Sequence, residues 1–287
     1  MKQLKILFLA IIIFATGGCF NENNMENIDV YTTAYPIEYV VGRLYGEHSK
    51  IDSIYPNGSL PGEIVNDKLL KDYSECDLFV FNSLAPNEQD YIYKMLDNNR
   101  KLKIIDVSSS IVYEHKVEEL WLDPTNLLTI ANNIKKGLEE YISTTYLLED
   151  VYENYDILRQ ELFKLDADYR EMAQRANKNT IVVSDDMFLY LEKYDIKVIS
   201  LEENENLTQK KIHTVTTMIK NGDIKYIYVT NNSEVNDTIK AIQKETNVEL
   251  IELHTLYTLS EEEENQGLDY FIIMRNNLEL LKKQLYN

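Results

Sequence analysis

The feature that most constrains this chain is a long stretch without glycine or proline in its middle. Between Val151 and Ala176 apolar residues recur at alternating spacings of four and three, which places them on one face of an α-helix. These residues are Val151, Tyr155, Leu158, Leu162, Leu165, Tyr169 and Met172. At 1.5 Å per residue, such a helix would be about 39 Å long. The stripe covers fewer than four heptads, so a helix that links two lobes fits it better than one strand of a coiled coil.

Short β-rich segments alternate with helical spacing on both sides of this stretch. In the first half they occupy Ile28 to Thr33, Ile51 to Tyr55, Asp77 to Asn82 and Lys103 to Val107. In the second half they occupy Thr180 to Ser184, Ile196 to Ser200, Lys225 to Thr230 and Val248 to Glu252. Strands that alternate with helices predict parallel sheets with crossover helices. We therefore expect an α/β fold with two parallel-sheet lobes joined by one long backbone helix.

The N-terminus has the pattern of a bacterial secretion signal. Lys2 and Lys5 precede an apolar run at residues 7–14, which is too short to span a bilayer, and small residues then lead to Cys19. The segment Thr16 to Cys19 resembles a lipobox, in which the cysteine receives a diacylglyceryl group and becomes the new N-terminus. Two acyl chains hold a protein stably on a membrane. We expect a lipid-anchored protein on the extracytoplasmic face of the cell membrane.

These observations divide the chain into five parts. Residues 1–18 form the signal peptide, and 19–27 form a lipidated tether. Residues 28–147 form the N-terminal lobe, 148–178 the linking helix, and 179–287 the C-terminal lobe. A mature chain of this length suits two domains.

Charge and motif content exclude several function classes. The formal net charge is −19, from 29 basic and 48 acidic residues, so nucleic acid is not an expected partner. No nucleophile paired with a base, phosphate-binding loop or H-E-x-x-H motif is present, so we do not expect an enzyme. Cys76 has no partner once Cys19 carries lipid, and an internal disulfide is therefore not expected.

The segment "KVEELWLDPTN" predicts a helix start. Asp123 is the expected cap, and Pro124 suits the first helical position. Trp121 and Leu122 are expected to lie in the core and to hold this segment against the first lobe. The paired carboxylates just before the tryptophan, Glu118 and Glu119, are then expected at the lip of a cleft between the lobes.

The order of these features resembles the solute-binding lipoproteins of bacterial ABC importers for zinc and manganese, across nearly the whole mature chain. The matching segments are "VYTTAYPIEYVV", "IYPNGSLPGEIVND", "ECDLFVFNS", "LWLDPTN", "NTIVVSDDMFLYLEKYDIKVISL" and "YFIIMRNNLELLKKQL". The resemblance implies two α/β lobes joined by one long helix, a divalent metal ion held between them as the transported ligand, and little hinge opening. It also implies an ABC permease and its ATPase as partners, with the binding protein a monomer.

The metal ligands that the resemblance implies are altered in this chain. Gly62 and Glu119 stand where the family offers histidines, and Asp185 stands where it offers histidine or glutamate. His254 stands near the family's last acidic ligand. The histidine-rich loop that many zinc members carry is absent from the sequence. Glu119, Asp185 and His254 would supply two carboxylates and an imidazole, an oxygen-rich set that shifts preference from zinc toward manganese. Glu63 could be recruited in place of Gly62.

Each of these residues also has a structural interpretation. Glu119 could lie in solvent or cap the nearby helix, Asp185 could cap the helix that follows its strand, and His254 could be a satisfied structural histidine. Glutamates 261–264 are expected to form a solvated loop. Two other functions therefore stay open. The same fold could bind a non-metal solute, or the chain could be a surface adhesin or accessory lipoprotein with a degenerate site.

Overall fold

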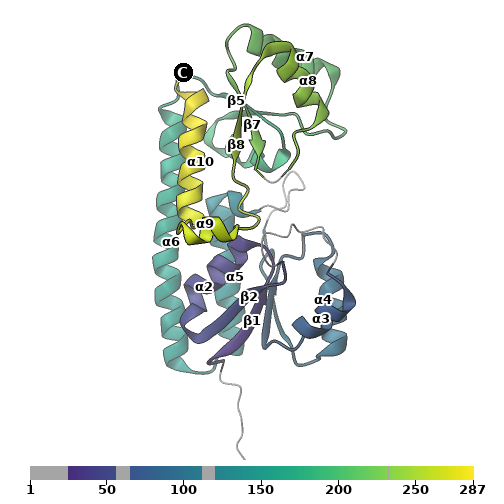
Figure 1. Cartoon of the computed structure of the whole chain (residues 1–287). Helices are drawn as coiled ribbons and strands as arrows, with labels where there is room; N and C mark the ends of the chain where they lie inside the picture. The colour runs from purple at the N-terminus through teal and green to yellow at the C-terminus, as the bar shows by residue number, and fades with distance from the viewer. Residues whose placement is uncertain (1–24, 56–64, 112–119, 232) are drawn as a thin grey trace, which may run out of the picture.

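The computed structural model describes residues 25–55, 65–111, 120–231 and 233–287, and they form two α/β lobes beside one long helix (Figure 1). In the N-terminal lobe the strands are β1 (Ile28–Thr32), β2 (Ser49–Ser53), β3 (Leu78–Phe81) and β4 (Lys103–Asp106). In the C-terminal lobe they are β5 (Thr180–Val183), β6 (Lys197–Ser200), β7 (Tyr226–Thr230) and β8 (Glu249–Leu253). All eight strand segments expected from the sequence are present.

The helices of the N-terminal lobe are α2 (Tyr35–Tyr45), α3 (Asp67–Tyr73), α4 (Glu88–Asn98) and α5 (Pro124–Tyr141), with 3₁₀ turns η1 (Gly46–His48) and η3 (Leu120–Leu122). The long helix is α6 (Thr145–Gln174). The C-terminal lobe contains η4 (Asp186–Tyr194), α7 (Gln209–Lys220), α8 (Asp237–Thr246), α9 (Glu261–Asn265) and α10 (Tyr270–Leu285). None of the helices in the described parts of the chain is both long and apolar enough to cross a bilayer.

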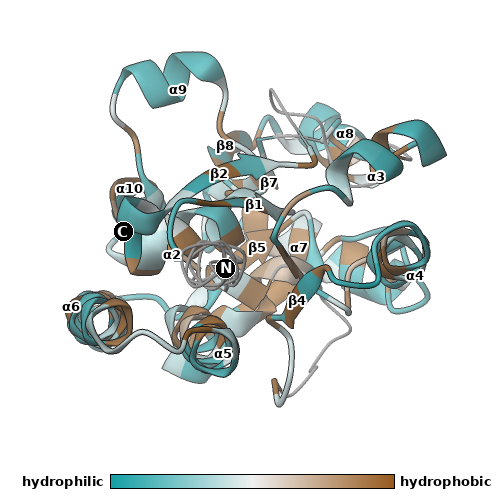
Figure 2. Ribbon diagram, turned by 90° about the horizontal axis from the view of Figure 1, so that it is seen from below, coloured by the Kyte–Doolittle hydropathy of each residue, from teal (hydrophilic) through white to brown (hydrophobic). Residues whose placement is uncertain are grey.

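The two sheets share one topology. Their strand orders are β2-β1-β3-β4 and β6-β5-β7-β8, and every pairing is parallel. Parallel strands need crossover helices, which explains why each strand is followed by helical or 3₁₀ segments. Apolar residues gather on the strands in the middle of the molecule, while the outward faces of the helices are hydrophilic (Figure 2). This arrangement confirms the expected fold of two parallel-sheet lobes joined by one long helix.

Helix α6 belongs to the core of both lobes. It packs against α2 and α5 of the N-terminal lobe and against α10 and η4 of the C-terminal lobe, and it runs alongside both (Figure 1). Its predicted stripe is buried except for Tyr155, which is partly buried beside the Lys135 ammonium. One continuous cluster of buried side chains therefore extends from the first lobe into the second. Because α6 is shared in this way, the lobes are joined by packing as well as by chain connection.

Candidate functional site

The expected site lies where the strands of both sheets end. In parallel α/β sheets ligands bind outside the carboxyl ends of the strands. Thr33 follows β1, and in the second lobe Asp185 and His254 follow β5 and β8. Segments beyond these ends join the lobes directly, because the Tyr35 backbone N–H donates to the Tyr257 carbonyl oxygen at 3.0 Å.

Asp185 is half-buried and begins η4. Its backbone is extended, and its Oδ1 accepts a hydrogen bond from the Met187 backbone N–H at 2.9 Å. The capping role that the sequence suggested for Asp185 is therefore present. The neighbouring Asp186 contacts a loop of the same lobe. Its Oδ2 accepts a hydrogen bond from the side-chain amide of Asn204 at 3.0 Å.

His254 is held by both ring nitrogens. Its Nδ1 accepts the Leu256 backbone N–H at 2.9 Å, so we assign the proton to Nε2, which lies 3.1 Å from Glu263 Oε1. Burial lowers the pKa of this histidine, while the Glu263 carboxylate opposes that shift. The backbone at His254 is held to α10 by two hydrogen bonds with the Asn277 side chain, of 2.9 and 2.8 Å. Ligation of a metal by Nε2 would require the proton to move to Nδ1 and the Leu256 bond to break.

The expectation of a loop at residues 261–264 is wrong, because these residues begin helix α9, although Glu261, Glu262 and Glu264 are exposed to solvent as expected. Ser260 and Glu263 form a capping box, in which the serine hydroxyl accepts the Glu263 backbone N–H and the Glu263 carboxylate accepts the Ser260 backbone N–H. Burial would raise the pKa of Glu263, but hydrogen bonds from Ser260 and His254 lower it. The S-x-x-E spacing was the available signal for this helix start. The contact with His254 had no sequence signal.

Two of the implied ligand positions, Gly62 and Glu119, lie outside the described residues, as do Glu63 and Glu118. Among the residues that are described, no group of three His, Cys, Asp or Glu side chains lies close enough to hold a metal ion. Of the other histidines that the structure describes, His48 pairs with Asp150 at 2.9 Å and His213 is exposed on α7, so neither joins Asp185 or His254. His115 lies outside the described residues. The three-residue ligand set of Glu119, Asp185 and His254 therefore stays a prediction.

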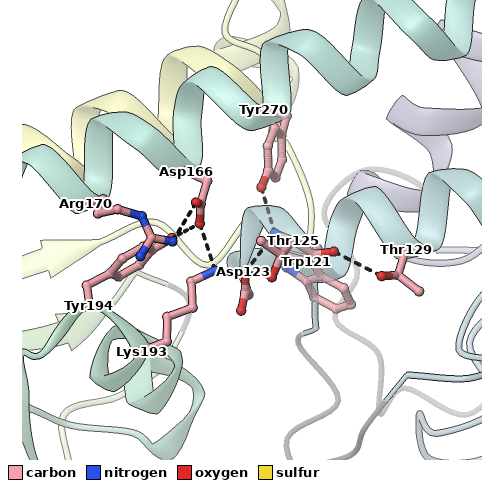
Figure 3. Close-up of polar contacts among 9 residues, drawn as sticks. All are labelled: Trp121, Asp123, Thr125, Thr129, Asp166, Arg170, Lys193, Tyr194 and Tyr270. Carbon is pink, nitrogen blue, oxygen red and sulfur yellow. Dashed lines mark hydrogen bonds and ion pairs between the residues drawn. The ribbon is translucent and has the colours of Figure 1, made fainter.

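Trp121 lies in the core, as expected, with 1% of its surface exposed. Its indole Nε1–H donates to the Thr255 carbonyl oxygen at 2.9 Å. The Tyr270 hydroxyl donates to the backbone carbonyl oxygen of Trp121 at 2.8 Å (Figure 3). The ring meets Tyr257 edge to face at 5.1 Å between centroids. All three partners belong to the second lobe. The expectation that Trp121 holds its segment against the first lobe is therefore incomplete, because this side chain also joins the two lobes.

A cluster of charged residues lies beside Trp121 (Figure 3). Asp123 caps α5 by accepting the Thr125 backbone N–H at 2.8 Å, as expected. Its Oδ1 also pairs with the Lys193 ammonium from η4, and that ammonium lies 3.1 Å from Asp166 Oδ1 on α6. Asp166 also forms an ion pair with the Arg170 guanidinium at 3.0 Å and accepts a hydrogen bond from the Tyr194 hydroxyl at 2.8 Å. Lys193 thus connects a helix cap of the first lobe to the long helix.

Two parallel-sheet lobes, a shared long helix and polar residues at facing strand ends define a bilobed solute-binding protein. A family model described as "Zinc-uptake complex component A periplasmic" matches residues 30–284. The chain belongs to this family, whose members are components of an uptake complex and not enzymes.

Similar proteins carry names that agree with this family. The zinc-binding lipoprotein AdcA of Streptococcus pneumoniae R6 is 22% identical over 311 residues, covering 99% of this chain and 61% of AdcA. The chain therefore spans about three fifths of the length of that relative. The high-affinity zinc uptake system protein ZnuA of Bacillus subtilis is 24% identical over 325 residues, which cover 99% of this chain and 98% of ZnuA. The Zn(II)-bound ZnuA-like domain of S. pneumoniae AdcA superposes with a TM-score of 0.74 at 22% identity, covering 91% of this chain and all of that one.

Proposed function

We propose that this protein is the extracytoplasmic, lipid-anchored solute-binding component of an ABC importer, and that it delivers a divalent transition metal ion to a permease and its ATPase. The observation that carries the proposal is membership, over residues 30–284, in a family described by zinc uptake. The names of AdcA and ZnuA support it. Asp185 and His254 follow the carboxyl ends of β5 and β8, and in parallel α/β sheets ligands bind outside those ends.

The proposed ligands are Glu119, Asp185 and His254, with zinc or manganese as cargo. Glu263 is a further candidate donor, because its Oε1 lies 3.1 Å from His254 Nε2 and two ligand atoms on one ion lie about 3 to 4 Å apart. It would replace the donor that Gly62 lacks. Metal binding would then move the Nε2 proton of His254 and turn its ring away from Leu256. Carboxylate oxygens in the majority favour manganese over zinc.

Metal binding is tested by equilibrium dialysis of the full chain, purified in detergent, against Mn²⁺ and Zn²⁺. Wild type is expected to bind one ion, and Glu119→Ala or Asp185→Ala should each weaken binding at least tenfold, about 1.4 kcal/mol. Gly62→His should strengthen zinc binding by restoring an imidazole. Asp97→Ala, an exposed change on α4, serves as the control and should bind like wild type. Failure of wild type to bind either ion would contradict the metal assignment.

A non-metal solute in the same fold is the second candidate. It is favoured by the engagement of both His254 nitrogens and by the absence of a side chain at Gly62. A surface adhesin or accessory lipoprotein with a degenerate site is the remaining alternative. The same dialysis separates these two from the metal proposal, since neither predicts stoichiometric metal.

Lipid anchoring through Cys19, which lies outside the described residues, is tested by counting thiols. The chain has two cysteines, and Cys76 is buried with its pKa raised to about 12 by that burial. Protein from membranes of a lipoprotein-processing bacterium should therefore react very slowly with a thiol reagent when folded. In denaturant it should show one thiol per chain, because the other sulfur carries lipid. Two thiols in denaturant would show that Cys19 is unmodified and would rule out the anchor.

A further inference from the structure

A pocket of about 510 Å³ lies in the second lobe, and its described wall contains neither Asp185 nor His254. All four residues of β6, from Lys197 to Ser200, line it. Successive side chains of a strand point to opposite faces of the sheet, so a pocket that contacts four in a row lies along the edge of the strand. Strand β6 is an edge strand, because it pairs only with β5. The pocket is therefore a groove with a sheet edge as its floor.

The two walls of the groove come from opposite faces of the sheet. On one face η4 contributes Leu189, which packs against the same hydrophobic cluster as Val198. The opposite face is covered by α7 and α8, and there Ile199 belongs to a separate cluster (Figure 1). Asp186 lies at the η4 wall, where its carboxylate already accepts the Asn204 amide. The groove thus has an η4 wall and an α7 wall, with the edge of β6 between them.

The backbone of β6 has hydrogen-bonding groups that point into this groove. Lys197 and Leu201 donate their backbone N–H groups toward β5, to the carbonyl oxygens of Asn179 and Val183, at 2.6 and 2.9 Å. In a parallel pair alternate residues bond to the same neighbour, so the N–H and C=O groups of the residues at positions 198 and 200 point away from β5. Such an open edge can pair with one further strand.

Positive charge gathers on the α7 wall of the groove. Lys197, Lys210 and Lys211 line it, and none of their ammonium groups has an ion-pair or hydrogen-bond partner among the described residues. Lys197 lies on the same face as Ile199, two positions on, and the other two lysines are in the first turn of α7. The start of a helix carries a partial positive charge, which disfavours lysines there. In a chain of net charge −19, this wall therefore lacks a negative partner.

We propose that the groove binds an extended, acidic segment of a partner protein, which adds to the second sheet as a strand beside β6. Its backbone would pair with the open groups of Val198 and Ser200. Side chains alternate along a strand, so its acidic residues would face the lysines of the α7 wall while the residues between them, which are apolar, would face Leu189 and Val198. A small inorganic anion would use the lysines but not the backbone edge. This site is separate from the proposed metal site and does not depend on it.

Fluorescence anisotropy of a labelled peptide, with the full chain in non-ionic detergent at low ionic strength, tests the groove. The probe is a seven-residue peptide that alternates glutamate and valine. Wild type should bind one peptide, and Lys210→Glu combined with Lys211→Glu should weaken binding at least tenfold. Acidic residues suit the start of a helix, so this variant should stay folded. The control combines Lys240→Glu with Lys244→Glu, exposed changes on α8 outside the groove, and should bind like wild type.

Hydrogen–deuterium exchange separates strand addition from attraction between charges alone. The bound peptide should slow exchange of the Val198 and Ser200 amides, because these N–H groups gain partners. The amides of Lys197 and Leu201 are already bonded to β5 and should change little. A peptide with lysine in place of glutamate should neither bind nor slow exchange.

Three results would overturn the proposal. The first is no saturable binding of the peptide up to about 1 mM, and the second is equal weakening by the two double variants. The third is binding that inorganic phosphate displaces and that leaves exchange in β6 unchanged, which would make the groove an anion site without strand addition. The α7 double variant should keep the Mn²⁺ and Zn²⁺ affinities of wild type. Peptide binding with slowed exchange in a protein that binds no metal would support this site and contradict only the metal cargo.

Discussion

Replacing Trp121 by alanine is expected to lower the free energy of unfolding by about 3 to 5 kcal/mol, the usual cost of truncating a buried aromatic side chain. The indole is 1% exposed, and it donates a hydrogen bond to Thr255 and packs against Tyr257 across the lobe junction. The loss therefore includes a cavity and a contact between lobes. Urea unfolding followed by far-UV circular dichroism measures it, since the variant has no tryptophan fluorescence.

One further variant separates the contribution of the hydrogen bond from that of ring packing, and a second serves as a control for the loss of an aromatic side chain. Trp121→Phe keeps an aromatic ring but loses the hydrogen bond to the Thr255 carbonyl, and it should cost less than alanine. Tyr93→Ala removes an aromatic side chain that is 67% exposed, and it should stay within about 0.5 kcal/mol of wild type. A loss below about 1 kcal/mol for Trp121→Ala would mean that the tryptophan does not join the lobes.

Replacing Lys193 by methionine is expected to cost about 2 to 4 kcal/mol at neutral pH, because it leaves two poorly exposed carboxylates without their shared ammonium. The side chains of Asp123 and Asp166 are only 11% and 15% exposed. Lys220→Met is the matched control: it breaks a similar pair with Glu245, but those side chains are 54% and 56% exposed, and its effect should be small.

The pH dependence of the Lys193 variant gives an independent readout. Burial would raise the pKa of Asp166, but hydrogen bonds from Tyr194, Arg170 and Lys193 hold it below the ordinary 3.8. A lowered folded pKa contributes stability that is present above pH 4 and is lost as the pH falls through the folded value. Lys193→Met should raise that pKa, so the stability gap from wild type should be widest at neutral pH and should narrow in acid. A gap that does not change between pH 7 and pH 3 would contradict the role assigned to Lys193.

Local signals predicted the elements of this fold well. The period of the stripe in α6, the β-rich segments and the capping pair of Asp123 and Pro124 are each encoded within a few residues, and each appears in the structure. The parallel pairing within both sheets follows from the repeated alternation of strands with helices, whereas the order of the strands was not predicted. The second strand begins two residues earlier than expected, at Ser49. The error at residues 261–264, where a loop was expected, came from overlooking the capping spacing of Ser260 and Glu263.

The candidate site was less predictable, because local sequence could say which residue types end each strand but not what their side chains contact. His254 is engaged by Leu256 and by Glu263, and the latter contact depends on where α9 packs. The contact of Asp185 was easier to predict, because its capping partner, the Met187 backbone N–H, lies only two residues along the chain.

The sequence by itself determined the two α/β lobes and the long helix between them, since these depend on the periodicity of apolar residues. The ligand positions Gly62, Glu119, Asp185 and His254 are implied by the family resemblance and stay a prediction. Only the tertiary structure decided the contacts between lobes. Trp121 and Thr255 are separated by 134 residues, and Lys193 and Asp123 by 70. The backbone hydrogen bond between Tyr35 and Tyr257 likewise forms only once the lobes have docked. Such pairings depend on how two folded surfaces meet, and short-range patterns of apolar and polar residues carry no information about that meeting.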